Sequence, residues 1–187
     1  DGSAHLMSMF YTMSQLGAWR PARESNLLDG GVPYYGAYGT ADGKHISIGP
    51  IEPQFFAQMV QLADMPEHII EDQNNPQKWP QIKTIFTDTF KSKTRDQWVE
   101  IFEGTDACVA GILDIHEALD HPHNKARQTY IEINGQQQPA PAPRFSRSQC
   151  GTPTAPSAEG ADTKAVLADW GFDQSAIDAL DQKGVLT

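Results

Sequence analysis

The chain has 187 residues, with 14 basic side chains against 24 acidic ones and a formal net charge of −10. This length is enough to bury a hydrophobic core, and the acidic balance disfavours non-specific binding to nucleic acid or to anionic membranes. No apolar run approaches the length of a membrane-spanning helix, and the first residues lack the basic start of a signal peptide, so we expect none.

The first predicted element is a single amphipathic helix over about residues 5–19. Gly17 lies near its end and Pro21 lies past it. Its apolar side chains recur at helical spacing; they are Leu6, Met9, Phe10, Met13 and Leu16. A methionine stripe at this spacing is more often core than a yielding binding surface. Because the sequence enters this helix without an initiating Met, we expect it to be a piece of a longer protein.

After a polar linker, an antiparallel hairpin and a helix are predicted. Residues 34–40 alternate aromatic and small side chains, and residues 44–48 alternate polar and apolar ones, as half-buried strands do. Asp42-Gly43 between them is typical of a tight turn. Glu52-Pro53 then opens a helix over about residues 53–63, with an acidic group near its positive end and proline in the first turn.

The next stretch is predicted to be mostly helical. Residues 64–76 are irregular and acidic, and residues 79–90 carry apolar side chains on one helical face. Thr94 opens a capping-box pattern for a helix through about Glu103. Residues 107–113 are expected to form a short buried strand.

The last third is predicted to contain shorter elements. Two brief helical pieces, residues 114–119 and 123–128, flank Pro122, and a strand over 129–133 leads into the hairpin turn Asn134-Gly135. Residues 136–138 would begin the return strand.

After residues 136–138, the proline-rich run at 139–146 suits an extended connector and not a central strand. Residues 150–160 form a linker rich in proline, serine, glycine and threonine. Two helices, over 163–170 and 175–183, would close the chain, with Ser175 as the N-cap of the second.

Neither cysteine nor histidine usage indicates a metal centre. Cys108 lies in an apolar run where a buried free thiol is expected, and with Cys150 it makes no disulfide framework. A reducing, cytoplasmic location fits this pattern. The nearby histidines, His116, His121 and His123, match no zinc-binding spacing. We therefore predict no metal.

Several segments together resemble one superfamily. They are Leu28–Phe56, Trp79-Pro80, Gly104–Val109, His123–Lys125 and Pro141–Ser146. Their order and rough spacing are similar to those of the family III CoA-transferase superfamily (CaiB/BaiF type), and within it to the α-methylacyl-CoA racemases. The resemblance covers nearly the whole chain and corresponds to the C-terminal half of such a protein.

The resemblance implies an α+β fold. A small α+β domain with an antiparallel hairpin and helices, residues 34–128, would be flanked by helical and extended segments of an incomplete large α/β domain. Residues 1–33 would be a helix and linker from that large domain, and residues 129–187 its returning connector and C-terminal helices. Subunits of this family interlock, so an interlocked or domain-exchanged homodimer is expected.

The chemistry that the resemblance implies is epimerisation at the α-carbon of 2-methylacyl-CoA thioesters, an isomerase activity of fatty acid metabolism. One base removes the α-proton and an acid returns it on the other face. In the racemases an Asp and a His do this, and both would precede Asp1. This chain alone is therefore expected to be inactive. The CoA thioester is the substrate, and no separate cofactor is implied.

Within the chain, the resemblance points to two places. The family's glutamate that supports the catalytic histidine follows a Trp-Pro dipeptide, and here that position is Gln81. The nearest substitute carboxylate is Asp88, two helical turns on. The acyl side of the cleft is lined in the family by the run that here contains Gly30, Gly31, Pro33, Tyr34 and Tyr35.

The sequence leaves two alternatives open. The intact protein would be a family III CoA transferase if an upstream Asp formed an aspartyl-CoA thioester. The chain would be a non-catalytic dimerisation or binding module if 187 residues were its natural length. Gln81 and the glycine-tyrosine run also have purely structural interpretations, as a solvated first-turn residue and as a turn leading into a core strand.

Overall fold

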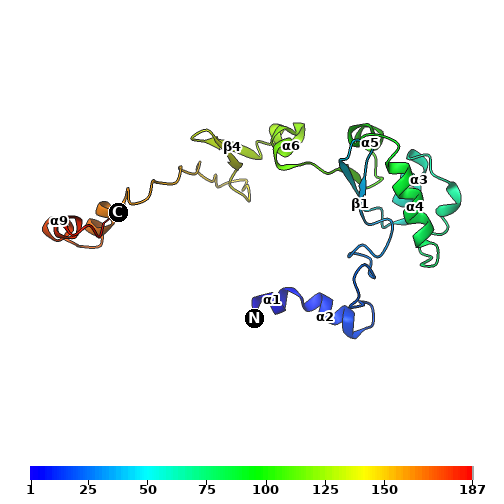
Figure 1. Cartoon of the computed structure of the whole chain (residues 1–187), viewed down its shortest axis with the longest axis horizontal. Helices are drawn as coiled ribbons and strands as arrows, with labels where there is room; N and C mark the ends of the chain where they lie inside the picture. Colours follow the sequence, from blue (N-terminus) through cyan, green and yellow to red (C-terminus); the bar gives the residue numbers. More distant parts are fainter. Residues whose placement is uncertain (187) are drawn as a thin grey trace. The chain divides into compact units, whose positions relative to one another are not determined.

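The structure is a computed structural model that describes residues 1–186 (Figure 1). The chain divides into two compact units, Asp1–Leu113 and a second unit that begins at Asp114. The partition at residues 33 and 128, which follows from the resemblance to a complete family member, stays a prediction.

The first unit begins with two short helices, α1 (Gly2–Leu6) and α2 (Ser8–Gln15), where one continuous helix was predicted. The break lies at Met7, and neither helix buries a residue. Leu6 is 82% exposed and Leu16 is 78% exposed. The prediction that this methionine-rich stripe is core is therefore wrong for the described chain, because periodicity marks an apolar face but does not supply what covers it.

The predicted hairpin is confirmed. Strand β1 (Gly36–Gly39) pairs antiparallel with β2 (His45–Ile48), with Gly36 opposite Ile48. The chain returns much later to add β3 (Val109–Gly111) on the other side of β2, giving the order β1-β2-β3. The middle residue of β3, Ala110, is exposed because it lies on the same face of the sheet as the exposed Ala37, away from the core. This corrects the prediction of a buried strand.

Between β2 and β3 the helical predictions also hold. The chain forms α3 (Pro53–Leu62), a 3₁₀ turn η1 (Glu67–Ile69), α4 (Trp79–Phe90) and α5 (Arg95–Phe102). Thr94 and Gln97 form the predicted reciprocal capping box at the start of α5. In Figure 1 these helices gather beside the sheet, and α4 packs against β1 while α5 packs against β3.

An aromatic cluster forms the centre of this unit. Phe86 of α4 is fully buried and lies 5.8 Å from the ring of Tyr38 on β1 and 6.1 Å from Phe56 on α3. Phe90 continues the row to Trp98 of α5, at 5.4 Å. The indole nitrogen of Trp98 donates a 2.8 Å hydrogen bond to the Phe90 carbonyl, so its polar edge is satisfied inside the core.

In the second unit, the described residues 114–186 form six short elements. They are α6 (Ile115–Asp120), α7 (Pro122–Ala126), β4 (Tyr130–Ile133), β5 (Gln136–Pro139), α8 (Thr163–Asp169) and α9 (Gln174–Gln182). The predicted second hairpin is confirmed, with Ile133 opposite Gln136. Two details differ from expectation. Pro122 is the first residue of α7, and Asp173 caps α9 through a 2.8 Å bond from the Ala176 amide, whereas Ser175 only donates to that same carboxylate.

The α+β fold class is confirmed by these helices and antiparallel strand pairs. Among the described residues, no helix is both long and apolar enough to span a bilayer.

Candidate functional site

The loop before the predicted acyl-side run is organised by Asn26 and Asp29. The Asn26 side chain is buried, accepts a bond from the Arg20 amide and donates to the Arg20 carbonyl. Asp29 accepts from both the backbone and the side-chain nitrogen of Asn26, at 2.7 Å each, and from the Gly31 amide at 3.3 Å. These bonds hold the backbone of the loop in one conformation immediately before the two glycines.

The two glycines of this run are required for different reasons. Gly30 has φ of +90°, a conformation that side chains disfavour. At Gly31 the limitation is space: a β-carbon would lie 2.6 Å from the Asn26 backbone nitrogen and oxygen and 2.7 Å from the Ser25 carbonyl carbon. The close approach of two backbone segments, rather than an unusual dihedral, therefore selects glycine at position 31.

The loop should be sensitive to acid through Asp29. Desolvation raises the pKa of this carboxyl. Hydrogen bonds from the Asn26 side chain and from the Asn26, Ser25 and Gly31 amides together lower the pKa by more than desolvation raises it, so the net pKa is below the ordinary 3.8. A depressed native pKa means stability that is present above the unfolded-state pKa and lost as pH falls through the native one.

We therefore expect Asp29→Asn to lower the unfolding temperature at pH 6, and we expect this difference from the parent chain to shrink as the pH falls below 3.8. Thermal unfolding of both proteins between pH 6 and pH 3 measures the difference between their unfolding temperatures. A difference that stays constant with pH would show that the Asp29 charge contributes nothing to stability.

The remaining residues of the run divide into buried and exposed ones. Pro33 is fully buried, and its carbonyl accepts a 2.6 Å bond from the Tyr38 hydroxyl. Tyr34 is also buried, stacks edge-on against Phe56 and donates to the side-chain oxygen of Asn74 at 3.2 Å. Burial raises the pKa of Tyr34, so it stays a neutral phenol. Tyr35 is 37% exposed, which leaves it and the two glycines as the parts of the run that a ligand could touch.

Gln81 lies in the first turn of α4, exposed to solvent. The same helix contacts the glycine loop through Lys83, whose ammonium group is 3.8 Å from the Glu24 carboxylate. The Glu24 side chain in turn lies 3.6 Å from where a β-carbon on Gly30 would be. The two regions that the resemblance selects are 46 residues or more apart in the chain, and they approach each other through Glu24 and Lys83.

Neither cysteine lies in a setting that would make its thiol reactive. Cys108 is exposed, which corrects the prediction of a buried thiol. Partial burial, Glu52 and Asp106 all raise its pKa, so it is held away from the reactive thiolate form. Cys150 is also free and exposed. Within residues 1–186, no group of histidine, cysteine and acidic side chains has the arrangement of a metal site.

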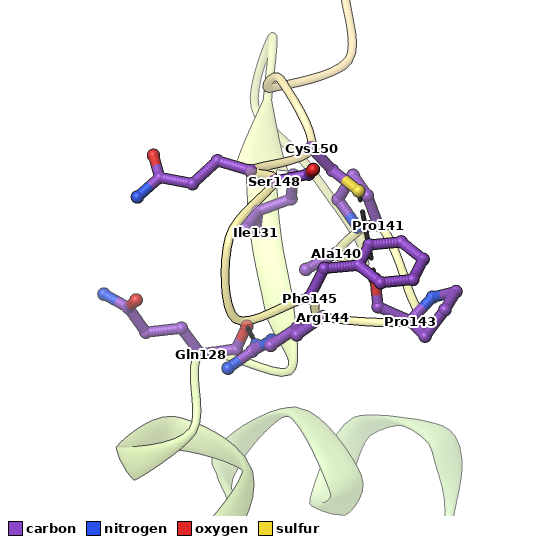
Figure 2. A pocket seen from close by; sticks show the side chains of 10 residues that line it. Gln128, Ile131, Ala140, Pro141, Pro143, Arg144, Phe145, Ser148 and Cys150 are labelled. Atoms are coloured by element: carbon purple, nitrogen blue, oxygen red, sulfur yellow. Dashed lines mark hydrogen bonds between the residues drawn. The ribbon is translucent and has the colours of Figure 1, made fainter.

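The second unit contains a hollow of about 420 Å³ walled by the Pro141–Ser146 segment (Figure 2). Arg144 donates a 2.7 Å bond to the Gln128 carbonyl, which fixes the segment against the end of α7, and the Cys150 thiol faces the Pro143 carbonyl at 3.9 Å. None of the predicted site residues lines this hollow. The residues that line the hollow hold the Pro141–Ser146 segment in place, and no two of them form a pair suited to proton transfer.

Sequence reasoning missed Asn26 and Asp29, which hold the loop before the two glycines. It also missed Gln73, whose side chain donates to the Pro50 and Ile51 carbonyls. Asn26 and Asp29 form an Asx-type turn signal that could have been found locally. Gln73 sits in a stretch interpreted only as irregular, and no local signal indicates that its side chain is buried.

Comparison with known proteins identifies the family. The model of CoA-transferase family III matches residues 1–163. The chain is 40% identical to the alpha-methylacyl-CoA racemase of Mus musculus over 184 residues, covering 95% of this chain and 47% of the mouse protein. It is 35% identical to the Homo sapiens alpha-methylacyl-CoA racemase over 192 residues, covering 100% of this chain and 49% of the human protein.

The fold agrees with a solved structure as well. A CAIB/BAIF family protein from Brucella suis superposes with a TM-score of 0.66 at 14% identity, over 88% of this chain and 44% of that one. The chain spans about half the length of the curated relatives it matches. A family match over most of its residues, with relatives at this identity, places the chain in CoA-transferase family III.

Proposed function

We propose that this chain is the C-terminal half of an α-methylacyl-CoA racemase-like enzyme, which epimerises the α-carbon of 2-methylacyl-CoA thioesters. The observation that carries the proposal is the 40% identity to the mouse racemase over 95% of the chain. The CoA thioester is the substrate, and the proposed reaction needs no separate cofactor.

The proposed division of labour rests on the resemblance to the racemases. The aspartate and histidine that exchange the proton would precede residue 1, and this chain would supply the acyl-side surface of Gly30, Gly31 and Tyr35 and, at Gln81, the position that supports the histidine. The α-proton of a thioester is weakly acidic, so its removal needs a correctly placed base and a means of stabilising the enolate. Residues 1–187 alone should therefore show no turnover.

Exchange of the α-proton tests the proposal. The polypeptide encoded by the complete reading frame that contains this chain is incubated in D₂O with (R)- and (S)-2-methylacyl-CoA, and deuterium incorporation and loss of optical purity are followed. We expect both from the complete polypeptide and neither from residues 1–187. Turnover by residues 1–187 alone would contradict the placement of the proton-transfer groups.

A change at Gln81 tests its role. Gln81→Glu in the complete polypeptide should increase α-proton exchange by about tenfold or more, because a carboxylate beside an imidazole raises its pKa and stabilises the imidazolium, whereas an amide only donates or accepts a hydrogen bond. The matched control is Gln77→Glu, an exposed glutamine just before α4, which should leave the rate unchanged. Equal rates for the parent and Gln81→Glu would remove position 81 from the site.

The second candidate within the family is a CoA transferase, which the family description itself favours. The same incubation separates the two when a free carboxylate acceptor is added. A racemase exchanges the α-proton without moving CoA, and a transferase produces the acceptor's CoA ester.

A non-catalytic dimerisation or binding module is the candidate from a different class, and the neutral side chain at Gln81 favours it. Tight binding of a CoA thioester without exchange or transfer by the complete polypeptide would select it.

The exposed apolar side chains of α1 and α2, with Leu6 and Leu16 the most exposed, support the proposed interlocked homodimer. The two free cysteines support a cytoplasmic location.

A further inference from the structure

Gln73 stands out because its side chain is buried although it lies in an irregular loop between η1 and α4. It is 3% exposed, whereas glutamine is usually a surface residue. Its amide nitrogen donates two bonds, at 2.9 Å to the Ile51 carbonyl and at 3.3 Å to the Pro50 carbonyl. Both hydrogens of the amide are therefore committed to the backbone that leaves β2.

The backbone of the same residue holds the start of α4. The indole nitrogen of Trp79, the first residue of α4, donates a 2.8 Å bond to the Gln73 carbonyl. Trp79 also packs against the hydrophobic core. Gln81 follows two residues later, so the location of its side chain depends on where the loop places this first turn.

The next residue connects the loop to the predicted acyl-side run. The side-chain oxygen of Asn74 accepts the hydrogen bond from the Tyr34 hydroxyl. Tyr35, the exposed neighbour of Tyr34, lies against Gly49, whose β-carbon would be 3.6 Å from the tyrosine ring. The backbone around Gly49–Ile51, the run at residues 30–35 and the first turn of α4 are thus joined at Gln73 and Asn74.

We propose that Gln73 is a positioning residue for the acyl-side surface: its buried amide sets the distance between the run at residues 30–35 and residue 81 on α4. The proposal rests on the proposed function for its catalytic consequence and on the hydrogen bonds of Gln73 for its geometry. A methionine at this position would fill nearly the same volume but would donate no hydrogen bond, so the Pro50 and Ile51 carbonyls would lose their partner. The loop would then shift or sample several arrangements.

The first test uses residues 1–187 and needs no activity. The protein is labelled uniformly with ¹⁵N. The indole signal of Trp79, one of four tryptophans, is assigned from Trp79→Phe, and the side-chain amide signal of Gln81 is assigned from Gln81→Glu. In Gln73→Met we expect the Trp79 indole signal and the Gln81 side-chain amide signal to move or broaden. Gln61→Met, the same change at an exposed glutamine of α3, should leave both in place. Unchanged signals in Gln73→Met would overturn the proposal.

The second test measures kinetics in the complete polypeptide. Gln73→Met should lower kcat for α-proton exchange about tenfold to a hundredfold with little change in KM, because misplacement of reacting groups by about 1 Å costs this much. Val60→Ala, a change at a buried residue of α3 that weakens folding and removes no hydrogen bond, should keep the parent kcat below its unfolding temperature. Equal loss of kcat in both variants would reduce Gln73 to a purely structural role and overturn the proposal. Shifted signals in a protein that exchanges no α-proton would instead refute the proposed function and leave the placement of residue 81 by Gln73 supported.

Discussion

Replacing Gly31 by alanine is expected to destabilise the first unit by about 3 kcal/mol and to disorganise the loop that precedes the acyl-side run. The added β-carbon would meet backbone atoms of Ser25 and Asn26 at 2.6 to 2.7 Å, and backbone cannot move aside as a flexible side chain can. The movement would also break the bonds of Asp29 to Asn26 and Gly31. Urea unfolding of the parent and variant measures the loss.

Gly36→Ala is the matched control, because a β-carbon at Gly36 has no neighbour within 4 Å and the residue lies in β1. It should change stability by less than about 1 kcal/mol. If the two alanine variants unfold at the same urea concentration, the close approach at Gly31 has no energetic importance. In the complete polypeptide, Gly31→Ala should also reduce activity more than Gly36→Ala.

Phe86→Ala should have the larger effect, about 3 to 5 kcal/mol. The ring is fully buried between Tyr38, Phe56 and Phe90, with centroid separations of 5.8, 6.1 and 5.9 Å. Truncation leaves a cavity that three aromatic side chains from three different elements cannot close without moving the helices. Such a loss is a large part of the total stability of a domain of this size.

The effect of Phe86→Ala is checked by urea unfolding followed by tryptophan fluorescence, since Trp98 lies in the same core. Leu62→Ala on α3 serves as the control, because Leu62 is 37% exposed and its truncation leaves no closed cavity. A loss at Phe86 no greater than at Leu62 would mean that the aromatic cluster does not hold the sheet and helices together.

Both predictions concern the scaffold of the proposed site rather than its chemistry. Under the proposed function, the groups that transfer protons would lie before residue 1. What this chain can contribute is geometry: a loop held by Asp29, an exposed Tyr35 and the first turn of α4 fixed by Trp79. Changes in this scaffold should therefore lower kcat through misplacement and should leave the identity of the acid and base unaltered.

Much of the first unit could be predicted because its signals are local. The apolar spacing of α4 gave its bounds as Trp79–Phe90, and those are the bounds observed. The capping box at Thr94 needs only a side chain that reaches a backbone amide three residues on. The same local logic was ambiguous at α9, where Asp173 and Ser175 are both good N-cap residues and the aspartate takes the position.

The candidate site was predictable only in part. Resemblance of short motifs selected the glycine-tyrosine run and position 81, and these motifs can be recognised without knowing the fold. Which of those side chains are accessible could not be told in advance, since Pro33 and Tyr34 are buried while Tyr35 is exposed. Residues that are adjacent in the sequence can differ in burial in this way where the backbone changes direction. That change of direction depends on contacts with residues outside the run.

The amino-acid sequence by itself determined the family, through its motifs, and the helices and strands between residues 36 and 111. These elements could be predicted because spacing, caps and turn residues act over a few positions. Only the tertiary structure decided that Gln73 is buried beneath the Pro50 and Ile51 carbonyls, that Tyr34 reaches Asn74 across 40 residues, and that Cys108 is exposed. Burial and long-range hydrogen bonds depend on which distant segments meet. The free energy that brings these distant segments together is distributed over many contacts, so it cannot be inferred from any short stretch of sequence.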